Sequence, residues 1–170
     1  MKALQVDKGE VYVIDLRQPN LKENEVLIKL SYAGICRTDI AVMNGTLGKE
    51  TIIPGHEFSG YIEQGNKRFK KGTAVAVNPI QPCLNCEECK QDLKQLCQYS
   101  QMLGLDLNGA FSEYVKVRDD LVYEIPRNVT MQAAAFIEPI AASLAIFNTA
   151  IARTEKGAIL GESRIAHLMS

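Results

Sequence analysis

Short stretches in which apolar and polar residues alternate dominate the first two-thirds of the chain. They are rich in Val, Ile and Tyr, which suit half-buried strands, and turn-forming pairs such as Lys71-Gly72 and Asn108-Gly109 separate them. Many short strands at this spacing predict a β-barrel or a β-sandwich. The expected strands are Lys2–Asp7, Val11–Leu16, Glu25–Ile35, Phe58–Gln64, Thr73–Asn78, Ala110–Val117 and Leu121–Ile125.

Two helical segments interrupt the strand pattern. Thr38 or Asp39 can cap the first, which is short. The second is predicted over Met131–Ile151 with Thr130 as its N-cap. Because almost all of its residues are apolar, we expect it to have packing neighbours on every side. Pro139 lies inside this helix and should kink it.

The pattern changes once more near the end of the chain. Lys156–Gly161 combines a charged lead-in, a short apolar strand and a glycine, and Glu162–Ser170 can open a helix. This order is typical of the first half of a βαβ unit, whose strand needs a parallel partner. We therefore expect a β domain over 1–130, followed over 131–170 by a linking helix and an incomplete strand–helix unit.

The composition excludes several classes of protein. Of the 170 residues, 46% are hydrophobic and 23% are charged, which is an ordinary globular mixture. The formal net charge of −1 and the aromatic content of 6% give no reason to expect nucleic acid as a partner. The sequence contains no run of about 18 apolar residues, so it does not predict a membrane-spanning helix. The first residues lack a signal-peptide pattern, so we expect a cytoplasmic protein.

Four of the five cysteines lie within fifteen residues and give the strongest chemical signal. Four thiolates can surround one zinc ion tetrahedrally and leave no position for water, which is typical of a structural site. The surrounding lobe, residues 81–99, has few apolar residues, so zinc–sulfur bonds would hold its shape, and Lys90 and Lys94 would offset the negative charge. An iron–sulfur cluster and free thiols are the alternatives. The four residues are Cys83, Cys86, Cys89 and Cys97.

The fifth cysteine, Cys36, has a different set of neighbours. His56 and Glu57 follow it by about twenty residues, a spacing that a buried cysteine and a satisfied core histidine would explain equally well. Glu138 favours a metal site over a buried cysteine and a core histidine, because a carboxylate inside the apolar run at 136–140 needs a partner or a metal. One thiolate, one imidazole and one or two carboxylates would leave a position open for water or substrate. That arrangement is typical of a catalytic zinc.

Five motifs resemble those of the zinc-containing medium-chain dehydrogenases, in the same order and over nearly the whole chain. The polyol, glucose and threonine dehydrogenase branch is the most similar, because there a Glu-Pro pair supplies a carboxylate near the catalytic zinc. No histidine follows Asp39 closely, which disfavours threonine as the substrate. The motifs are Gly34–Asp39, Pro54–Glu57, the four-cysteine lobe, Gly109–Tyr114 and Glu138-Pro139.

The resemblance implies a GroES-like β-barrel catalytic domain, followed by a Rossmann domain that binds NAD(P). It implies two zinc ions per chain, one catalytic and one structural, and a small alcohol or polyol as substrate. Cys36 and His56 would be ligands of the catalytic zinc. Glu57 or Glu138 would be the third ligand, and the two would exchange as the site opens and closes.

The resemblance also implies roles for the residues around these ligands. Thr38 would be the first proton acceptor from the substrate alcohol. Asp39 would hydrogen-bond His56 and fix its tautomer. Arg37 would lean toward a cofactor phosphate, and Gly161 would begin the glycine-rich cofactor loop.

The chain departs from the family in its last segment. The family's chains are longer, and here the Rossmann domain stops after one strand and part of a helix. Ser163 stands where the second glycine of the cofactor loop would let the backbone approach a pyrophosphate. We therefore expect a truncated enzyme whose cofactor site is incomplete and which is inactive by itself.

Three functions follow as hypotheses. The first is the catalytic part of an alcohol or polyol dehydrogenase. The second is a stand-alone zinc-binding module without activity, which binds a partner through the apolar helix. The third is a hydrolase or lyase that uses the open zinc without a nicotinamide. In addition, the helix over 131–151 predicts self-association through Phe136, Ile140, Leu144 and Phe147.

Overall fold

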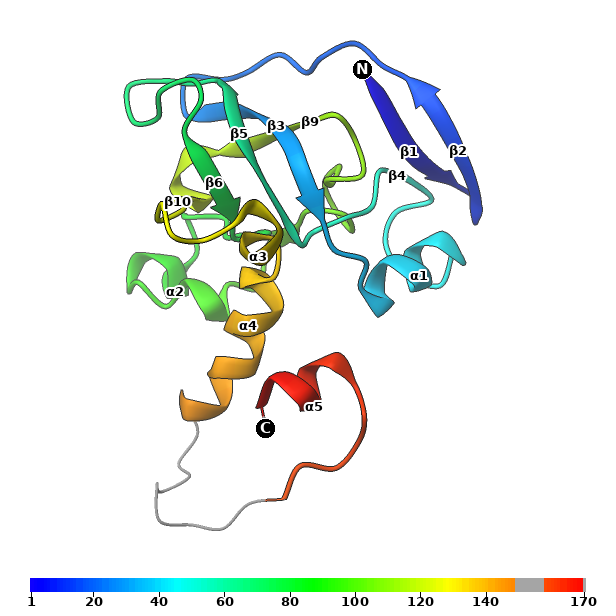
Figure 1. Cartoon of the computed structure of the whole chain (residues 1–170), viewed down its shortest axis with the longest axis vertical. Coiled ribbons are helices and arrows are strands. Elements are labelled where there is room, and N and C mark those ends of the chain that lie inside the picture. The colour runs from blue at the N-terminus through cyan, green and yellow to red at the C-terminus, as the bar shows by residue number, and fades with distance from the viewer. Residues whose placement is uncertain (149–157, 170) are drawn as a thin grey trace.

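Two antiparallel sheets form the centre of the β domain in the computed structural model, which describes residues 1–148 and 158–169 (Figure 1). The predicted mainly β architecture is confirmed. The larger sheet has the order β10-β6-β5-β3-β9, with bounds Val122–Glu124, Ala74–Val77, Phe58–Gln64, Glu25–Ala33 and Tyr114–Arg118. The smaller sheet has the order β2-β1-β4, with bounds Glu10–Asp15, Lys2–Asp7 and Thr51–Ile52.

All seven predicted strands are present, and β1 and β5 have the predicted bounds. Three strands were not predicted, because each has only two residues and shows no alternation. They are β4 and the pair formed by β7 (Ile80–Gln81) and β8 (Gln101–Met102). The sheets meet where Leu4 N donates to Phe111 O at 2.8 Å and Ala3 bridges Ser112. Apolar side chains of the larger sheet form the core, among them Val26, Ile28, Phe58, Ile62, Val75 and Val122.

The first helix, α1 (Arg37–Met43), begins at least two residues earlier than the predicted caps, Thr38 or Asp39, would place it. Neither Thr38 nor Asp39 is its N-cap, because Cys36 takes that position in extended geometry. Asp39 instead reaches back from the first turn, and its Oδ2 accepts a hydrogen bond from Cys36 N at 2.7 Å. This capping interaction fixes the backbone at Cys36.

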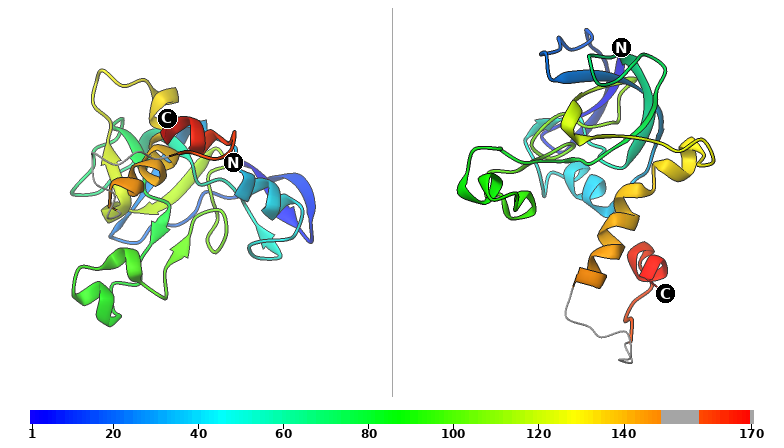
Figure 2. Two further views of the ribbon diagram at one scale, coloured as in Figure 1. Left: turned by 90° about the horizontal axis from the view of Figure 1, so that it is seen from below. Right: turned by 90° about the vertical axis from the view of Figure 1, so that its left-hand side faces the viewer.

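The four-cysteine lobe grows out of the β7–β8 hairpin and projects from the β domain (Figure 2). It contains α2 (Glu87–Lys90) and the short 3-10 helix η1 (Lys94–Leu96). A second 3-10 helix, η2 (Asp119–Leu121), links β9 to β10.

The long apolar helix is divided into α3 (Met131–Ala134), α4 (Ile137–Leu144) and the 3-10 helix η3 (Ala145–Asn148). Its predicted N-cap is confirmed, since Thr130 Oγ1 accepts from Ala133 N at 3.2 Å. The break comes before Pro139 rather than at it. Proline has no N–H, so Pro139 cannot donate the helical hydrogen bond to the carbonyl four residues earlier. The first helical segment therefore ends before it, and a new helix, α4, begins with Pro139 in its first turn. The rest of the predicted helix, 149–151, lies outside the described residues.

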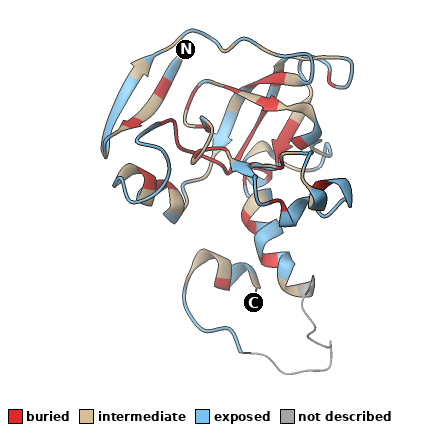
Figure 3. Ribbon diagram, turned by 180° about the vertical axis from the view of Figure 1, so that it is seen from behind, coloured by how far each residue is buried: buried red, intermediate tan, exposed pale blue. Residues whose placement is uncertain are grey.

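The prediction that this helix has neighbours on every side is wrong for α4. Four of its large apolar side chains, counting the N-cap, keep 39–54% of their surface exposed, as the pale segments of Figure 3 show. Pro139 and Ser143 are the buried residues of α4. The exposed row consists of Phe136, Ile137, Ile140 and Leu144.

The last segment confirms the predicted helix but not the predicted strand. α5 (Arg164–Met169) is helical and packs against α4 (Figure 2). Residues 158–160 are not a strand, because a lone strand has no parallel partner to hydrogen-bond here; 156–157 lie outside the described residues. Within the described ranges, no helix is long and apolar enough to cross a membrane.

Candidate metal centres

Cys36, His56 and Glu57 come together although about twenty residues separate the first from the other two. One ligand atom from each of the three lies within 4.8 Å of the others. Cys36 sits in the turn from β3 to α1, and the other two immediately precede β5. His56 is 2% exposed and Glu57 1% exposed. A soft thiolate, an imidazole and a carboxylate in one buried cluster are a donor set that suits zinc.

Asp39 organises this cluster from behind. Its side chain is completely buried, and Oδ1 accepts from Gly55 N at 3.0 Å and lies 3.2 Å from His56 Nδ1. Gly55 has φ +98°, and a Cβ there would lie 2.7 Å from Phe111 Cδ1, so only glycine fits. Asp39 thus ties the backbone before α1 to the turn that carries His56.

The imidazole of His56 is strongly influenced by these neighbours. Burial acts to lower its pKa, but Asp39 and Cys36 outweigh burial and raise the pKa to about 9. Among the described residues, no hydrogen bond of good geometry reaches the buried Nδ1. Asp39 Oδ1 lies beside Nδ1, so a metal ion among the thiol and carboxylates would bind the ring through its other nitrogen.

Glu57 is held tightly on two sides. A Cβ at Gly34 would lie 2.5 Å from Glu57 Oε2, so the missing side chain makes room for the carboxylate. On the other side, Arg164 of α5 pairs with both carboxylate oxygens: Nη1 contacts Oε2 at 2.8 Å, and Nη2 contacts Oε1. This pairing raises the pKa of Arg164, although burial opposes it.

Glu138 does not join the three-residue cluster, although the sequence placed it there as a candidate. It is half-buried on α4, and burial raises its pKa, with Glu57 and Asp39 adding to the effect. Its side chain borders an apolar cavity of about 370 Å³ between β6 and α4. The charges of His56 and Arg164 act on it, so it lies close enough to the cluster to sense it.

The remaining candidates lie at different distances from the cluster. Thr38 is beside it, with Oγ1 at 3.7 Å from Cys36 Sγ. Arg37 is exposed at the start of α1. Gly161 is exposed with φ +120°, and a Cβ there would touch nothing.

The four cysteines of the lobe form a second cluster, with their sulfurs within 4.8 Å of one another. Cys83 Sγ lies 4.0 Å from Cys89 Sγ, and Cys86 Sγ lies 3.8 Å from Cys97 Sγ. Backbone N–H groups of Asn85 and Cys86 donate to Cys83 Sγ at 3.4 and 3.3 Å, which lowers the pKa of that thiol to about 6. Donors aimed at sulfur favour the thiolate that zinc requires, so this geometry fits a structural zinc.

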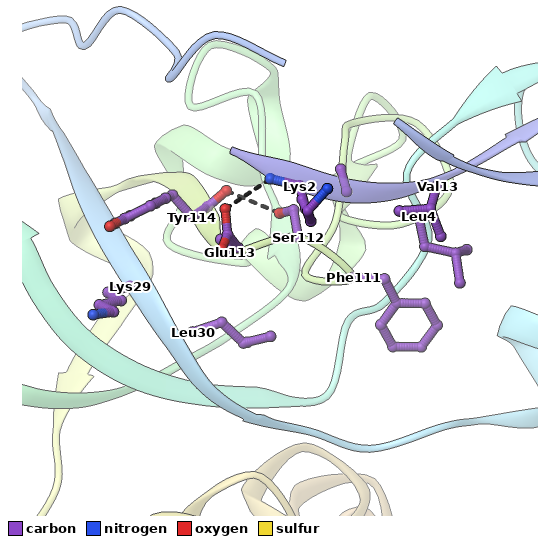
Figure 4. A pocket seen from close by; sticks show the side chains of 10 residues that line it. Lys2, Leu4, Val13, Lys29, Leu30, Phe111, Ser112, Glu113 and Tyr114 are labelled. Carbon is purple, nitrogen blue, oxygen red and sulfur yellow. Dashed lines mark hydrogen bonds between the residues drawn. The ribbon is translucent and has the colours of Figure 1, made fainter. Parts of the chain in front are cut away.

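Neither cluster lies in the groove drawn in Figure 4. This open groove of about 510 Å³ runs between β1 and the segment leading into β9. Two of its charged groups are engaged, because Glu113 accepts from Lys2 N at 2.7 Å and Lys2 Nζ pairs with Asp15 at 3.4 Å. We therefore place the candidate chemistry at the two clusters.

Comparison with protein families confirms the expectation raised by the motifs. Residues 22–127 match the model of the alcohol dehydrogenase GroES-like domain. The chain belongs to this family. Both clusters fall within the GroES-like domain match, whereas α3, α4 and α5 lie outside it.

Known relatives of this GroES-like chain include polyol dehydrogenases. It is 36% identical over 144 residues to sorbitol dehydrogenase of Bacillus subtilis, covering 79% of this chain and 41% of the relative. The crystal structure of galactitol-1-phosphate dehydrogenase from Escherichia coli superposes with a TM-score of 0.80 at 32% identity, covering 87% of this chain and 44% of that one. A structure described as a zinc-binding dehydrogenase from Sinorhizobium meliloti 1021, bound to NADP, gives a TM-score of 0.91 at 28% identity, over 99% and 51% of the two chains. The chain thus spans less than half the length of the curated sorbitol dehydrogenase.

Two arginines of this GroES-like chain were not predicted as neighbours of the clusters. Arg118 lies behind the lobe, where Nη1 donates to Pro82 O at 2.9 Å and the guanidinium binds Asp120. Hydrogen bonding to Asp120 raises the pKa of Arg118, and the charge of Cys89 adds to it. Arg164 binds Glu57 from 107 residues away. No local sequence pattern predicts the contacts of Arg118 with Pro82 or of Arg164 with Glu57, because only the fold brings these distant segments together.

Proposed function

We propose that this chain supplies the zinc-binding part of an NAD(P)-dependent alcohol or polyol dehydrogenase. The observation that carries the proposal is the meeting of Cys36, His56 and Glu57 in one buried cluster. The match to the family's GroES-like domain includes this cluster, and two of the relatives named above are sorbitol dehydrogenase and galactitol-1-phosphate dehydrogenase. We divide the chain, as a proposal, into a catalytic domain over 1–130 and a linking part over 131–170.

Cys36 and His56 are the proposed ligands of a catalytic zinc, with Glu57 or Glu138 as the carboxylate candidates. Zinc bound here supplies a Lewis acid that lowers the pKa of an alcohol hydroxyl. The thiolate of Cys36 contributes one negative charge, and the buried position of His56 excludes water from one side. Together they leave room for an oxygen ligand from the substrate.

Thr38 and Asp39 assist in different ways. Thr38 Oγ1, at 3.7 Å from Cys36 Sγ, is placed to accept the hydroxyl proton of an alcohol held at the cluster and to pass it outward. Asp39 lies beside His56 Nδ1, which leaves Nε2 as the metal-binding nitrogen. The hydrogen bonds that Asp39 accepts from Cys36 N and Gly55 N hold its carboxylate beside His56 in the absence of metal.

The second proposed zinc is structural and binds Cys83, Cys86, Cys89 and Cys97. Its four sulfurs would complete the coordination, so it takes no part in the reaction. The lobe is small and mostly exposed, and the metal would supply the energy that a core supplies elsewhere. Arg118 and Lys94 would balance part of its negative charge.

The described residues around Gly161 do not fit a dinucleotide. Residues 158–160 form no strand, Ser163 replaces a glycine, and Arg164 is engaged by Glu57. We therefore derive no cofactor step from this segment or from Arg37, and we propose that the chain by itself does not oxidise alcohols with NAD(P).

A cobalt experiment tests the proposed function. Co²⁺ bound to the chain has an absorption spectrum that reports its ligands, and the Cys36→Ser variant serves as the control that retains only the lobe. Adding sorbitol should change the part of the spectrum that Cys36→Ser removes. Identical cobalt content and spectra in the two proteins would contradict the assignment of Cys36.

A second candidate function is a stand-alone zinc module that binds a partner. The exposed row of α4, which is apolar over four side chains, favours it. A sorbitol-insensitive cobalt spectrum at an intact Cys36 site would favour this function over the dehydrogenase.

A further inference from the structure

We propose that Arg164 is a positioning residue that holds the Glu57 carboxylate away from the metal bound by Cys36 and His56. This inference rests on the proposed function. It assigns a role to a residue that no sequence motif singled out. It also decides which of the two candidate carboxylates is free to reach the metal.

The contact between Arg164 and Glu57 engages the whole carboxylate. Nη1 contacts Oε2 at 2.8 Å and Nη2 contacts Oε1, which is the parallel two-bond geometry that arginine forms with carboxylates. Within the described part of the chain, this is the one ion pair that Glu57 makes. Both oxygens therefore face the guanidinium.

The burial of the two partners makes this pair strong. Glu57 has 1% of its side chain exposed and Arg164 has 32%. A buried carboxylate without a counter-charge is costly, so Glu57 keeps its arginine unless another cation replaces it. The pairing also makes Glu57 and Arg164 electrically neutral as a unit, so a metal at Cys36 would face one anionic ligand rather than two.

Two further contacts restrict where this pair can move. Gly34 lies against Glu57 Oε2, so closely that a Cβ there would be 2.5 Å away. On the other side, the Arg164 guanidinium lies 5.7 Å from the centre of the Phe136 ring. The carboxylate is thus enclosed between the backbone of Gly34 and an arginine that is itself stacked on an aromatic ring.

Glu138 is left as the carboxylate that is not held in this way. It sits on α4, half-buried, and no ion pair is found for it within the described residues. With Glu57 held by Arg164, Glu138 is the carboxylate that is free to approach the metal, although in this structure it lies outside the three-residue cluster. The family resemblance left the choice between the two carboxylates open.

The test compares cobalt spectra of four proteins: the full chain, Arg164→Gln, Glu57→Gln and the double variant. The Cys36→Ser spectrum is subtracted from each to remove the lobe. We expect Glu57→Gln to leave the spectrum unchanged and Arg164→Gln to shift it, because a freed Glu57 would join the metal. The double variant should return to the spectrum of the full chain. Arg127→Gln, at an exposed position, is the charge-matched control.

Two outcomes would overturn the inference while leaving the proposed function intact. One is a changed spectrum in Glu57→Gln, which would show that Glu57 is a ligand even with Arg164 present. The other is an unchanged spectrum in Arg164→Gln. If instead the cobalt content and spectrum are the same in the full chain and in Cys36→Ser, the proposed function itself fails, and this inference fails with it.

A second measurement needs no metal. Ala166 N and His167 N donate to Ser163 at the start of α5, so their hydrogen exchange reports on the docking of this helix. In metal-free protein, Arg164→Gln and Glu57→Gln should each speed this exchange about tenfold, and the double variant no more than either alone. Additive effects of the two substitutions would show that the residues act independently and would contradict the pairing.

Discussion

Asp39 and His56 face each other across the base of the open cluster, with Oδ1 at 3.2 Å from Nδ1 and both side chains almost fully buried. The same carboxylate accepts hydrogen bonds from the backbone of Cys36 and of Gly55. One side chain therefore connects both halves of the cluster. It fixes the direction of His56 and the backbone of Cys36 at the same time.

Asp39→Asn should weaken both the fold and the metal site. An amide cannot accept all the hydrogen bonds that the carboxylate accepts, and its NH2 group would face a backbone donor. We expect the free energy of unfolding to fall by about 1.5–3 kcal/mol and zinc affinity at Cys36 to fall about 10–100-fold. Urea unfolding of the metal-free chain and competition with a chelator measure the two effects. Asp15→Asn, at an exposed residue, should change neither.

Zinc content should separate the two clusters. We expect the metal-replete chain to carry close to two zinc ions and Cys36→Ser close to one, because loss of the thiolate removes one of few ligands. The open site should also lose its zinc to a chelator first, since the four sulfurs of the lobe enclose the other ion. Elemental analysis before and after chelator treatment provides the check. Release of both ions at one rate would contradict the distinction between open and closed sites.

The sequence predicted the β domain well because its signals are local. Strand alternation and turn residues located all seven longer strands, and cysteine spacing located the lobe. Cys36 and His56 lie close together in the structure, with Asp39 beside His56. The strands and the lobe depend on spacings of a few residues, whereas Cys36 and His56, twenty residues apart, were connected through the family's motifs.

The differences from the sequence predictions have two sources: local backbone geometry at Pro139 and contacts between segments that are far apart in the sequence. Pro139 was expected to kink a continuous helix, but its missing N–H acts on the preceding turn and divides the helix there. Glu138 stays a candidate ligand, but it lies outside the three-residue cluster, because its position depends on how α4 leaves the β domain. Arg164 was passed over because its partner, Glu57, is 107 residues away. Sequence periodicity contains no information on such pairings.

Gly34→Ala should disturb Glu57 without straining the backbone. The new Cβ would lie 2.5 Å from Oε2, so the carboxylate and its ion pair would have to move. Overpacking of this kind typically costs about 1–3 kcal/mol, and thermal unfolding of the metal-free chain measures it. Glu57→Asp in the same protein shortens the side chain and should recover part of the loss. An equal loss with and without Glu57→Asp would show that the crowding lies elsewhere.

Cys86→Ser should loosen the lobe and leave the β domain folded. Removal of one sulfur takes away a large share of the roughly 10–16 kcal/mol that zinc contributes to small domains. Hydrogen exchange at the amides of Asn85 and Cys83, which donate to sulfur, should become fast. Cys36→Ser is the matched control, and the lobe should stay protected in it. Unchanged protection in Cys86→Ser, with unchanged zinc content, would show that the lobe is not a metal site.

The exposed row of α4 should make the chain self-associate. Leu144 is 54% exposed, and Phe136, Ile137 and Ile140 are 39–41% exposed, and their spacing of three to four residues places them along one side of the helix. Burial of such a surface stabilises association by roughly 25 cal/mol per Å² before entropic costs. Sedimentation velocity over a range of concentrations should show a dimer or larger species that the double variant Ile140→Ser/Leu144→Ser dissociates. Val13→Ser is the control, because Val13 is 73% exposed on β2, away from this row, and should leave association unchanged. Two results would contradict self-association through this row. One is a chain that stays monomeric at high concentration, and the other is a dimer that Val13→Ser dissociates as well as the double variant does.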